Sequence, residues 1–342
     1  AAQAKASSKV LASADDLSDE QFSKAATFGL VARVRGVAQA SEEEQRKVLD
    51  LVKRQLSIGV ERGLQQSDLA NASMLASYLE RYGDGVLAAE AYRSFADLLK
   101  DAKNPAYRAY SERFEGTARR LSLLGNPIEL HGKLLDGSDF DWDAYRGKVV
   151  LVDFWATWCG PCIAEAPNVR KQYELYHDLG FDVVGISLDT DKSALEAYVQ
   201  KENVPWVNLF HEGAGWKHPM AMKYGVSAIP TVFLVDREGN VVSLRARGPE
   251  LGMQLKKLFD TKADWERAIA LYNDQITPET NDAQLLARRA SAYTAIEQWD
   301  RAKSDWLRAT ESDPSFCKEA FDRYRKSDRW SEAAEFGLKW VD

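Results

Sequence analysis

The sequence predicts an α/β domain in the middle of the chain, between two all-helical regions. In the first third, apolar residues recur every three or four positions, which is typical of amphipathic helices. In the middle third, short β-branched runs alternate with helical segments, which predicts a parallel-rich sheet with right-handed crossovers. In the last third, tryptophan-led segments repeat. A length of 342 residues is enough for two or three such domains.

Composition excludes several classes of protein. The net charge is −7 and no basic block is present, so we expect no nucleic-acid or anionic-lipid partner. No run approaches the roughly 18 apolar residues of a membrane helix. Three cysteines are too few for a disulfide scaffold of this length. The chain opens at Ala1 without an apolar signal core, which indicates either the mature form of an exported protein or a recombinant fragment. We expect the exported form, mainly because of the family resemblance described below.

The first region, residues 15–124, is expected to be an α-helical domain. Residues 1–14 are small and polar, which predicts a disordered tail. Glycines punctuate the middle of this region, and Pro105 stands where the first turn of a helix tolerates proline. The expected helices are Asp19–Gln39, Glu42–Leu56, Ser67–Tyr82, Val86–Lys100 and Pro105–Leu124.

The second region, residues 125–260, carries the strand signals. The runs "KVVLVDFWA", "FDVVGISL", "TVFLVD" and "NVVSLRAR" are rich in β-branched residues and have the length of strands. Helices are expected at Ala164–Leu179 and Ser193–Glu202. The segment "DREGN" between the last two runs predicts a hairpin turn. Pro249–Phe259 is expected to be the last helix of this domain.

The third region, residues 261–342, contains a repeat. "WERA", "WDRA" and "WSEA" begin at Trp265, Trp299 and Trp330, which gives a period near 34 residues. This period with helix-turn-helix texture resembles tetratricopeptide-like stacking. An aromatic residue precedes each tryptophan by six positions, and the first of these is Phe259. We therefore expect the helix that ends at Phe259 to serve also as the first helix of the array.

The most specific motif is the pair Cys159 and Cys162 in "WCGPC". The pair follows a strand and precedes a helix, so Cys159 is expected near a helix N-terminus, where N–H groups and the helix dipole favour a thiolate. A structural zinc site needs about four ligands and no second pair exists. A structural disulfide gains little from so short a loop. Redox activity is therefore favoured over both alternatives. The lone Cys317 is interpreted as a small core residue.

Two carboxylates flank the pair and are candidate bases. Asp153 lies in the apolar strand, and strand alternation places it among buried side chains. Glu165 lies three residues after Cys162, on the same helical face. A desolvated carboxylate has a raised pKa and can transfer a proton near neutral pH. The alternatives are a hydrogen-bonded core residue for Asp153 and a solvated first-turn acid for Glu165. His211 and His218 lie in a glycine-rich loop, which we expect beside the active-site face rather than at a metal.

Together, "VDFWATWCGPC" and, about seventy residues later, "IPTVFLVD" resemble the thioredoxin superfamily. The stretch "NPIELHGKLLDGSDFDWDAYRGKVVLVDFWATWCGPCIAEAPNV" and the segment "GISLDTDKSALEAYVQKENVPW" are similar to its TlpA/ResA branch of envelope thiol–disulfide oxidoreductases. The resemblance covers about residues 125–259. It implies a thioredoxin-like α/β fold for this part of the chain.

The resemblance implies roles for the positions that match. Cys159 corresponds to the nucleophile and Cys162 to the resolving thiol. Asp153 corresponds to the buried aspartate of thioredoxins, and Glu165 to the glutamate of the "CxxCxxE" pattern. The lysine that many thioredoxins place near the aspartate is absent, and Gly185 stands in the matching stretch. Proton transfer is then expected to depend more on Glu165.

The resemblance also implies a substrate groove. Pro230 corresponds to the cis-proline of the family, although its sequence context alone favours a trans bond. Ile229 would present its backbone to a bound substrate strand. Trp158 is expected to line the groove and Trp155 to pack beneath it. The groove residues are Trp158, Gly160, Pro161, Ile229 and Pro230.

These observations predict a thiol–disulfide oxidoreductase that reduces disulfides of exported proteins in the cell envelope or periplasm. The expected partners are a disulfide-containing protein, an electron-donor thiol–disulfide protein, often in the membrane in this family, and a protein partner on the helical flanks. No bound cofactor or metal is implied. The alternatives are a disulfide oxidase or isomerase, or a helical-repeat scaffold in which the redox domain is incidental.

Overall fold

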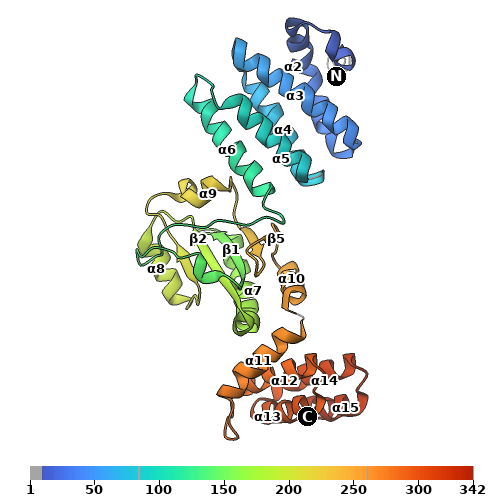
Figure 1. Cartoon of the computed structure of the whole chain (residues 1–342), viewed down its shortest axis with the longest axis vertical. Helices are drawn as coiled ribbons and strands as arrows, with labels where there is room; N and C mark the ends of the chain where they lie inside the picture. The colour runs from blue at the N-terminus through green and yellow to red at the C-terminus, as the bar shows by residue number, and fades with distance from the viewer. Residues whose placement is uncertain (1–9, 84, 260, 342) are drawn as a thin grey trace.

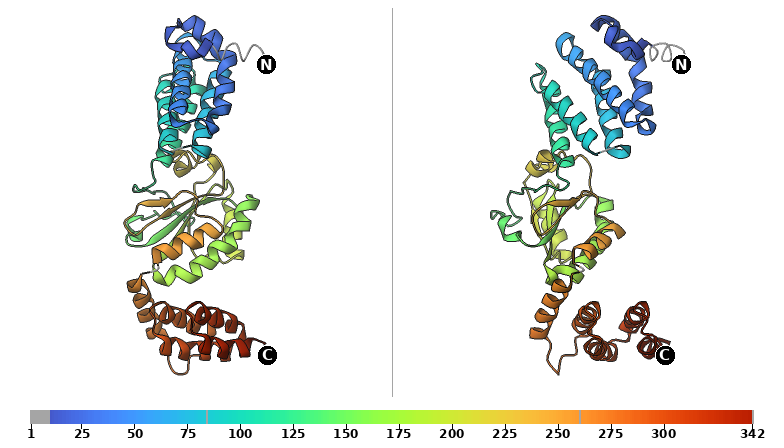
Figure 2. Two further views of the ribbon diagram at one scale, coloured as in Figure 1. Left: turned by 90° about the vertical axis from the view of Figure 1, so that its right-hand side faces the viewer. Right: turned by 45° about the vertical axis from the view of Figure 1, so that its right-hand side comes forward.

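The computed structural model describes residues 10–83, 85–259 and 261–341. The chain is elongated, with helices at both ends and a sheet between them (Figure 1). Figure 2 shows the same succession from two other sides. No described helix is both long and apolar enough to cross a membrane. The helices of the first part are α2 (Asp19–Gly36), α3 (Glu42–Arg62), α4 (Gln66–Tyr82), α5 (Gly85–Leu99) and α6 (Pro105–Leu121).

Local capping accounts for where these helices begin. Ser18 forms a capping box with Gln21 at the start of α2, and Ser41 accepts a hydrogen bond from the third residue of α3. Asn104 caps α6, whose first residue is Pro105. Each of these ends satisfies N–H groups that have no partner within the helix. The five predicted helices are therefore present, although α3 continues six residues beyond the predicted end at Leu56.

The prediction of a disordered tail is wrong for its last residues. Leu11–Asp16 form a 3₁₀ turn, and Leu11 is only 2% exposed in the core of the helical region. The side chain of Arg54 donates hydrogen bonds to the carbonyls of Ala14 and Leu17. Burial of one leucine and these bonds order the turn, although its composition is small and polar. The rest of the predicted tail, residues 1–9, lies outside the described residues.

The middle of the chain forms a mixed five-stranded sheet with strand order β3-β2-β1-β4-β5. Strands β1, β2 and β3 are parallel, whereas β4 is antiparallel to both β1 and β5. The predicted hairpin turn does connect β4 to β5. The sequence pattern missed β3, which has three residues and is too short to show an alternation. The bounds are β1 (Val149–Trp155), β2 (Phe181–Ser187), β3 (Val207–Leu209), β4 (Thr231–Val235) and β5 (Val241–Ser243).

Alternating residues of the strands build a core on each face of the sheet. On one face, Val149, Leu151 and their neighbours pack against α7 (Gly160–Tyr176) and α10 (Pro249–Phe259). On the other face, Val150 and Val152 pack with residues of α8 (Lys192–Lys201) and α9 (Pro219–Lys223). Figure 2 shows α7 and α10 together on one side of the sheet and α9 on the other. This three-layer arrangement is the thioredoxin-like fold that the resemblance implies.

The first of these cores continues into the last part of the chain. The apolar cluster that contains the sheet residues extends through Phe259 to Trp306 and Phe336. Arg237, just after β4, lies 4.7 Å above the Phe259 ring and pairs with Asp264 of α11 at 2.6 Å. The remaining helices are α11 (Lys262–Gln275), α12 (Ala283–Ala295), α13 (Trp299–Ser312), α14 (Cys317–Lys326) and α15 (Trp330–Val341). The tetratricopeptide-like assignment and the domain boundaries at 124 and 260 stay predictions.

A contact between two glycines joins the helical first part to the sheet. Gly116 of α6 lies against the backbone of the loop between α9 and β4. A Cβ atom at Gly116 would lie 2.6 Å from the carbonyl oxygen of Met222 and 2.7 Å from the nitrogen of Gly225. Gly225 has φ +58°, and a Cβ there would lie 2.3 Å from the nitrogen of Thr117. Only residues without side chains allow the two backbones to approach this closely.

We expect Gly116→Ala to lower the free energy of unfolding by about 1–3 kcal/mol, because the methyl group overlaps backbone atoms that no rotamer change can move. This cost exceeds the gain of about 1 kcal/mol in helix propensity. The measurement is urea denaturation followed by circular dichroism. Gly36→Ala is the matched control, because a Cβ at Gly36 meets nothing within 4 Å. Equal or higher stability of Gly116→Ala would show that the contact does not constrain the fold.

Candidate active site

The two cysteines lie where β1 ends and α7 begins. Cys159 is the N-cap residue of α7, and its Sγ accepts a hydrogen bond from the backbone N–H of Cys162 at 3.2 Å. The two sulfurs form a disulfide with an S–S distance of 2.08 Å and a Cα–Cα distance of 5.2 Å. Helix α7 begins at Gly160, four residues earlier than predicted, so Cys162 lies in its first turn. An N–H donor and the helix dipole at Cys159 favour a thiolate in the reduced protein.

A second carboxylate holds the loop before the cysteines. The backbone N–H and the hydroxyl of Thr157 both donate to Asp189, the hydroxyl at 2.6 Å. Ser187 also donates to Asp189, which is buried at the end of β2. These bonds fix the segment between β1 and Cys159 relative to the neighbouring strand. The sequence reasoning missed Asp189, because nothing in "SLDT" alone shows that it faces a segment 32 residues away.

Asp153 lies in the middle of β1, the strand that ends just before the cysteines. Its Oδ1 is buried and has no hydrogen-bond partner among the described residues. The pKa of Asp153 is raised to about 7, chiefly by burial and also by the nearby charge of Glu165, while the charge of Arg247 lowers it. The alternative of a hydrogen-bonded core residue therefore does not describe Oδ1. A carboxyl group of this kind exchanges its proton near neutral pH.

A cavity of about 330 Å³ connects Asp153 with the resolving cysteine. Asp153 and Cys162 both line it, with Trp155, Ile163 and Tyr198 among the apolar residues around them. The cavity gives the carboxyl group and the sulfur a common space on the α7 side of β1. A proton can therefore pass between these two groups directly or through one water molecule.

Glu165 is held by hydrogen bonds rather than free. Its Oε1 accepts from the backbone N–H of Gly248 and from the side-chain amide of Asn168, each at 2.7 Å. Asn168 also donates to the carbonyl of Gly248 at 3.1 Å. Glu165 thus ties the first turns of α7 to the start of α10. At this position its charge acts on Asp153, while its own oxygen is engaged with the backbone.

Gly185 has no side chain, and this leaves room for the side chains of its neighbours. In the register of the sheet it pairs with Asp153 on β1 and with Asn208 on β3. Asn208 accepts a hydrogen bond from the Trp155 indole at 2.9 Å, and a Cβ at Gly185 would lie 2.1 Å from the Asn208 oxygen. The Trp155–Asn208 pair therefore occupies the space beside Gly185. Trp155 packs beneath the site, as expected.

Of the predicted groove residues, Trp158 and Gly160 adjoin Cys159 in the chain, and Pro230 lies in the loop before β4. The Ile229–Pro230 peptide bond is cis, as the resemblance implies. Trp158 is 56% exposed, and its ring lies 6.1 Å from the ring of Trp216, which is 43% exposed. Gly160 and Pro161 are exposed beside the disulfide. The sequence reasoning missed Trp216, although its loop was expected on this face.

Arg247 is a further site residue that the sequence did not indicate. Its guanidinium donates a hydrogen bond to the carbonyl of Pro230 at 2.8 Å, and its charge lowers the pKa of Asp153. The residue thus links the cis-proline to the buried carboxyl group. It was read as part of the strand run "NVVSLRAR", which in fact ends as a strand at Ser243.

None of the residues set aside in the sequence lines the cavity shared by Asp153 and Cys162. His218 is buried and accepts a hydrogen bond from the Met220 N–H at the start of α9, and burial lowers its pKa to about 4. The His211 ring lies 6.2 Å from it. Cys317 is buried at the first residue of α14. Within the described ranges, no group of three or more His, Cys, Asp or Glu residues is arranged to hold a metal ion.

The raised pKa of Asp153 makes a prediction about stability. Because the folded protein holds the proton more tightly than the unfolded chain, stability falls as pH rises from about 4 to about 7. We expect oxidised Asp153→Asn to be more stable than wild type at pH 8 by up to about 4 kcal/mol, and the difference to shrink toward pH 4. Urea denaturation at several pH values measures it. A difference that does not change with pH would contradict the ionisation of Asp153.

Comparison with known proteins agrees with this geometry. Residues 118–257 match the Redoxin family. The thiol–disulfide oxidoreductase ResA of Bacillus thuringiensis subsp. konkukian is 29% identical over 129 residues, which are 38% of this chain and 69% of that protein. ResA of Bacillus subtilis is 29% identical over 116 residues, 34% of this chain and 60% of the relative.

Solved structures match a similar share of the chain. The thioredoxin domain of a thiol–disulfide oxidoreductase from Bacteroides vulgatus is 28% identical and covers 39% of this chain and 96% of its own, with a TM-score of 0.36. A thiol:disulfide interchange protein from Bacteroides sp. is 27% identical and covers 40% and 91%, with a TM-score of 0.37. From its sequence matches and its site, the middle of this chain is a thioredoxin-like thiol–disulfide oxidoreductase domain that matches the Redoxin family and is similar to ResA.

Proposed function

We propose that this protein reduces disulfide bonds of exported proteins, with Cys159 as the nucleophile and Cys162 as the resolving thiol. The observation that carries the proposal is the disulfide at the N-terminus of α7, where the Cys159 sulfur accepts the Cys162 N–H. Nothing else in the described residues combines a thiolate-stabilising position with a second sulfur within bonding distance. The exposed tryptophans beside it leave access for a polypeptide.

The reaction proceeds in two exchanges. The Cys159 thiolate of the reduced protein attacks one sulfur of the substrate disulfide, and the other substrate sulfur leaves as a thiolate that takes up a proton. The Cys162 thiol then loses its proton and attacks the Cys159 sulfur. The Cys159–Cys162 disulfide forms, and the second substrate sulfur leaves and is protonated. The substrate gains two electrons and two protons. The enzyme supplies both electrons and the proton of Cys162, and the second proton comes from solvent.

Asp153 is the residue that accepts the proton of Cys162. It lines the same cavity as Cys162, and a pKa of about 7 allows its carboxyl group both to take and to release a proton at neutral pH. Glu165 positions the junction of α7 and α10 and raises the pKa of Asp153 through its charge. The sequence favoured Glu165 for proton transfer, and this assignment gives that role to Asp153.

The turn and the resemblance support the proposed direction and location of the reaction. The CGPC turn is that of thioredoxin, a reductant near −270 mV. A reductant ends oxidised, so we propose a thiol–disulfide electron donor in or at the membrane and a location in the cell envelope. The helical regions on both sides of the redox domain are surfaces for protein partners. No resident cofactor takes part in the two exchanges.

The reduction potential tests the direction. We expect a value near or below about −250 mV, close to that of thioredoxin, from equilibration with glutathione or dithiothreitol buffers and tryptophan fluorescence. A value above about −180 mV would indicate an oxidase or isomerase instead. Failure of the pair to cycle at all would favour a scaffold whose helical regions are the working parts.

Single-cysteine variants test the two roles. We expect Cys162→Ser to accumulate a mixed disulfide with insulin, because the first exchange proceeds and no thiol resolves it. Cys159→Ser should form no such adduct above background. Non-reducing electrophoresis and mass spectrometry of the adduct measure both. An adduct that forms only with Cys159→Ser would reverse the assignment of nucleophile and resolving thiol.

A further inference from the structure

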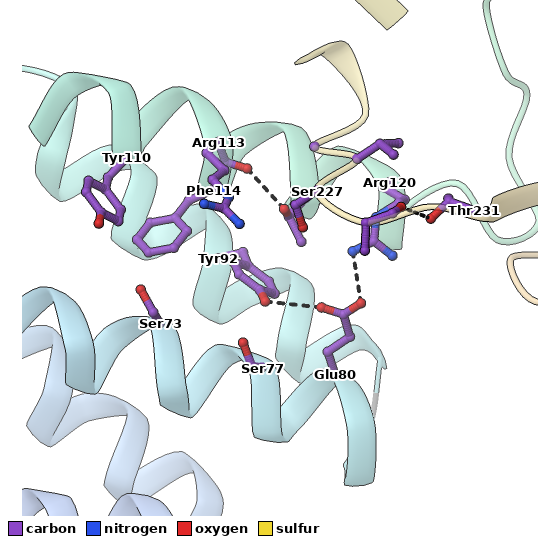
Figure 3. Close-up of a pocket in the computed structure, with 14 residues that line it drawn as sticks. Ser73, Ser77, Glu80, Tyr92, Tyr110, Arg113, Phe114, Arg120, Ser227 and Thr231 are labelled. Carbon is purple, nitrogen blue, oxygen red and sulfur yellow. Dashed lines mark hydrogen bonds and ion pairs between the residues drawn. The ribbon is translucent and has the colours of Figure 1, made fainter. Parts of the chain in front are cut away.

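The helical first part of the chain and the cis-proline loop enclose a cleft. A cavity of about 430 Å³ is lined on one side by α4, α5 and α6, with Glu80, Tyr92 and Arg113 among its residues. Its other side is the loop Gly225–Thr231, which contains the cis bond before Pro230. Figure 3 shows Arg113 on α6 opposite Ser227 of this loop. The Redoxin family match, residues 118–257, covers the loop but not the helices α4 and α5.

A second cavity extends the cleft toward the disulfide. It has a volume of about 400 Å³ and shares Arg113 and residues 225–227 with the first. Trp216 and Met222 form its apolar side, and both are exposed. The Trp216 ring contacts that of Trp158, the residue next to Cys159. The cleft therefore extends from the helices to Trp216, whose ring contacts the residue next to Cys159.

The loop offers backbone groups for an extended chain. Ser227 and Ala228 are exposed, and their N–H groups form no backbone hydrogen bond within the described ranges. Unpaired backbone beside an apolar wall is the requirement for binding an extended peptide by strand addition. The aromatic rings along the cleft provide apolar contact area for its side chains.

The charges of the cleft select the chemistry of that peptide. Arg113 forms no hydrogen bond through its guanidinium and no ion pair with any described residue. The one carboxylate of the first cavity, Glu80, is already engaged: Arg120 pairs with it at 2.9 Å and the Tyr92 hydroxyl donates to it at 3.1 Å. Arg245, after β5, donates a hydrogen bond to the carbonyl of Glu80 at 3.4 Å. The cleft thus has an excess of positive charge in a chain whose net charge is −7.

We propose that this cleft binds an extended segment of the disulfide substrate, and that Arg113 pairs with a carboxylate side chain of that segment. The inference rests on the proposed function, since the bound segment is the one that presents its cysteine to Cys159. It assigns to the helical first part of the chain a role in substrate selection. Glu80 and Arg120 in the cleft neutralise each other's charge (Figure 3). The positive charge of Arg113 is therefore the one that can pair with the ligand.

The test uses the full chain and synthetic peptides that each contain one internal disulfide. Within the set, aspartate or lysine replaces alanine at each of four positions on either side of the cysteine. The second-order rate constant for reduction by the dithiol form is measured by chromatography of the reduced peptide. At the best position, we expect wild type to prefer the aspartate peptide over the lysine peptide by about five-fold, the size of an exposed charge pair.

Variants of Arg113 identify the residue responsible. Arg113→Gln should remove the preference and Arg113→Glu should reverse it, because the ratio within each variant does not depend on its overall rate. Arg62→Gln is the matched control: it removes the same charge from the helical region, on α3, and lines neither cavity. Wild-type reduction of the small neutral 2-hydroxyethyl disulfide tests the proposed function alone.

The outcomes separate the two proposals. Reaction with 2-hydroxyethyl disulfide together with a charge preference that Arg113→Gln loses supports the cleft as the binding site. The same reaction without any preference, or with a preference that Arg113→Gln keeps, overturns the inference and leaves the dithiol chemistry intact. A wild-type protein that reduces neither the small disulfide nor the peptides contradicts the proposed function itself, and the inference with it.

Discussion

The hydrogen bond from the Cys162 N–H to the Cys159 sulfur is the interaction on which the chemistry of this protein depends. It exists because β1 ends in the core and α7 begins within a few residues, so that a sulfur takes the place of an N-cap oxygen. The bonds of Thr157 to Asp189 hold the connecting loop, and the tie of Glu165 to Gly248 holds the first turns of α7. Each of these polar contacts positions the same short junction.

On strand β1, the buried carboxyl group of Asp153 is the second group on which the chemistry depends. An unpaired oxygen in the core destabilises the folded protein when the carboxyl group is ionised. The same burial gives the protein a proton acceptor with a pKa of about 7. Arg247 limits the cost by lowering the pKa while it also holds the carbonyl of Pro230. One side chain therefore connects the proton acceptor with the loop that faces the substrate.

The helical parts of the chain are joined to the redox domain in two different ways. On the C-terminal side, an apolar core continues from the sheet through Phe259 into the last helices, and the Arg237–Asp264 pair spans the junction. On the N-terminal side, the backbones of Gly116 and Gly225 touch, and the cleft lies beside this contact. Because the contact involves the loop before the cis-proline, the position of α6 and the shape of the groove are coupled.

The sequence by itself determined the local structure and the reactive pair. Periodicity placed α2 to α6, α7, α8, α10 and four of the five strands, whereas α9 was not predicted. The family resemblance of the Cys159–Cys162 motif and the "IPTVFLVD" run indicated the thioredoxin-like fold. Only the tertiary structure decided the partners of these residues: the short strand β3, the buried Leu11, Asn208 in the space beside Gly185, and Arg247 and Arg113 near the cis-proline. Periodicity and spacing report contacts within one turn or one strand. Which distant side chains share a cavity depends on how close the backbones approach, and a single sequence does not encode that approach in a local pattern.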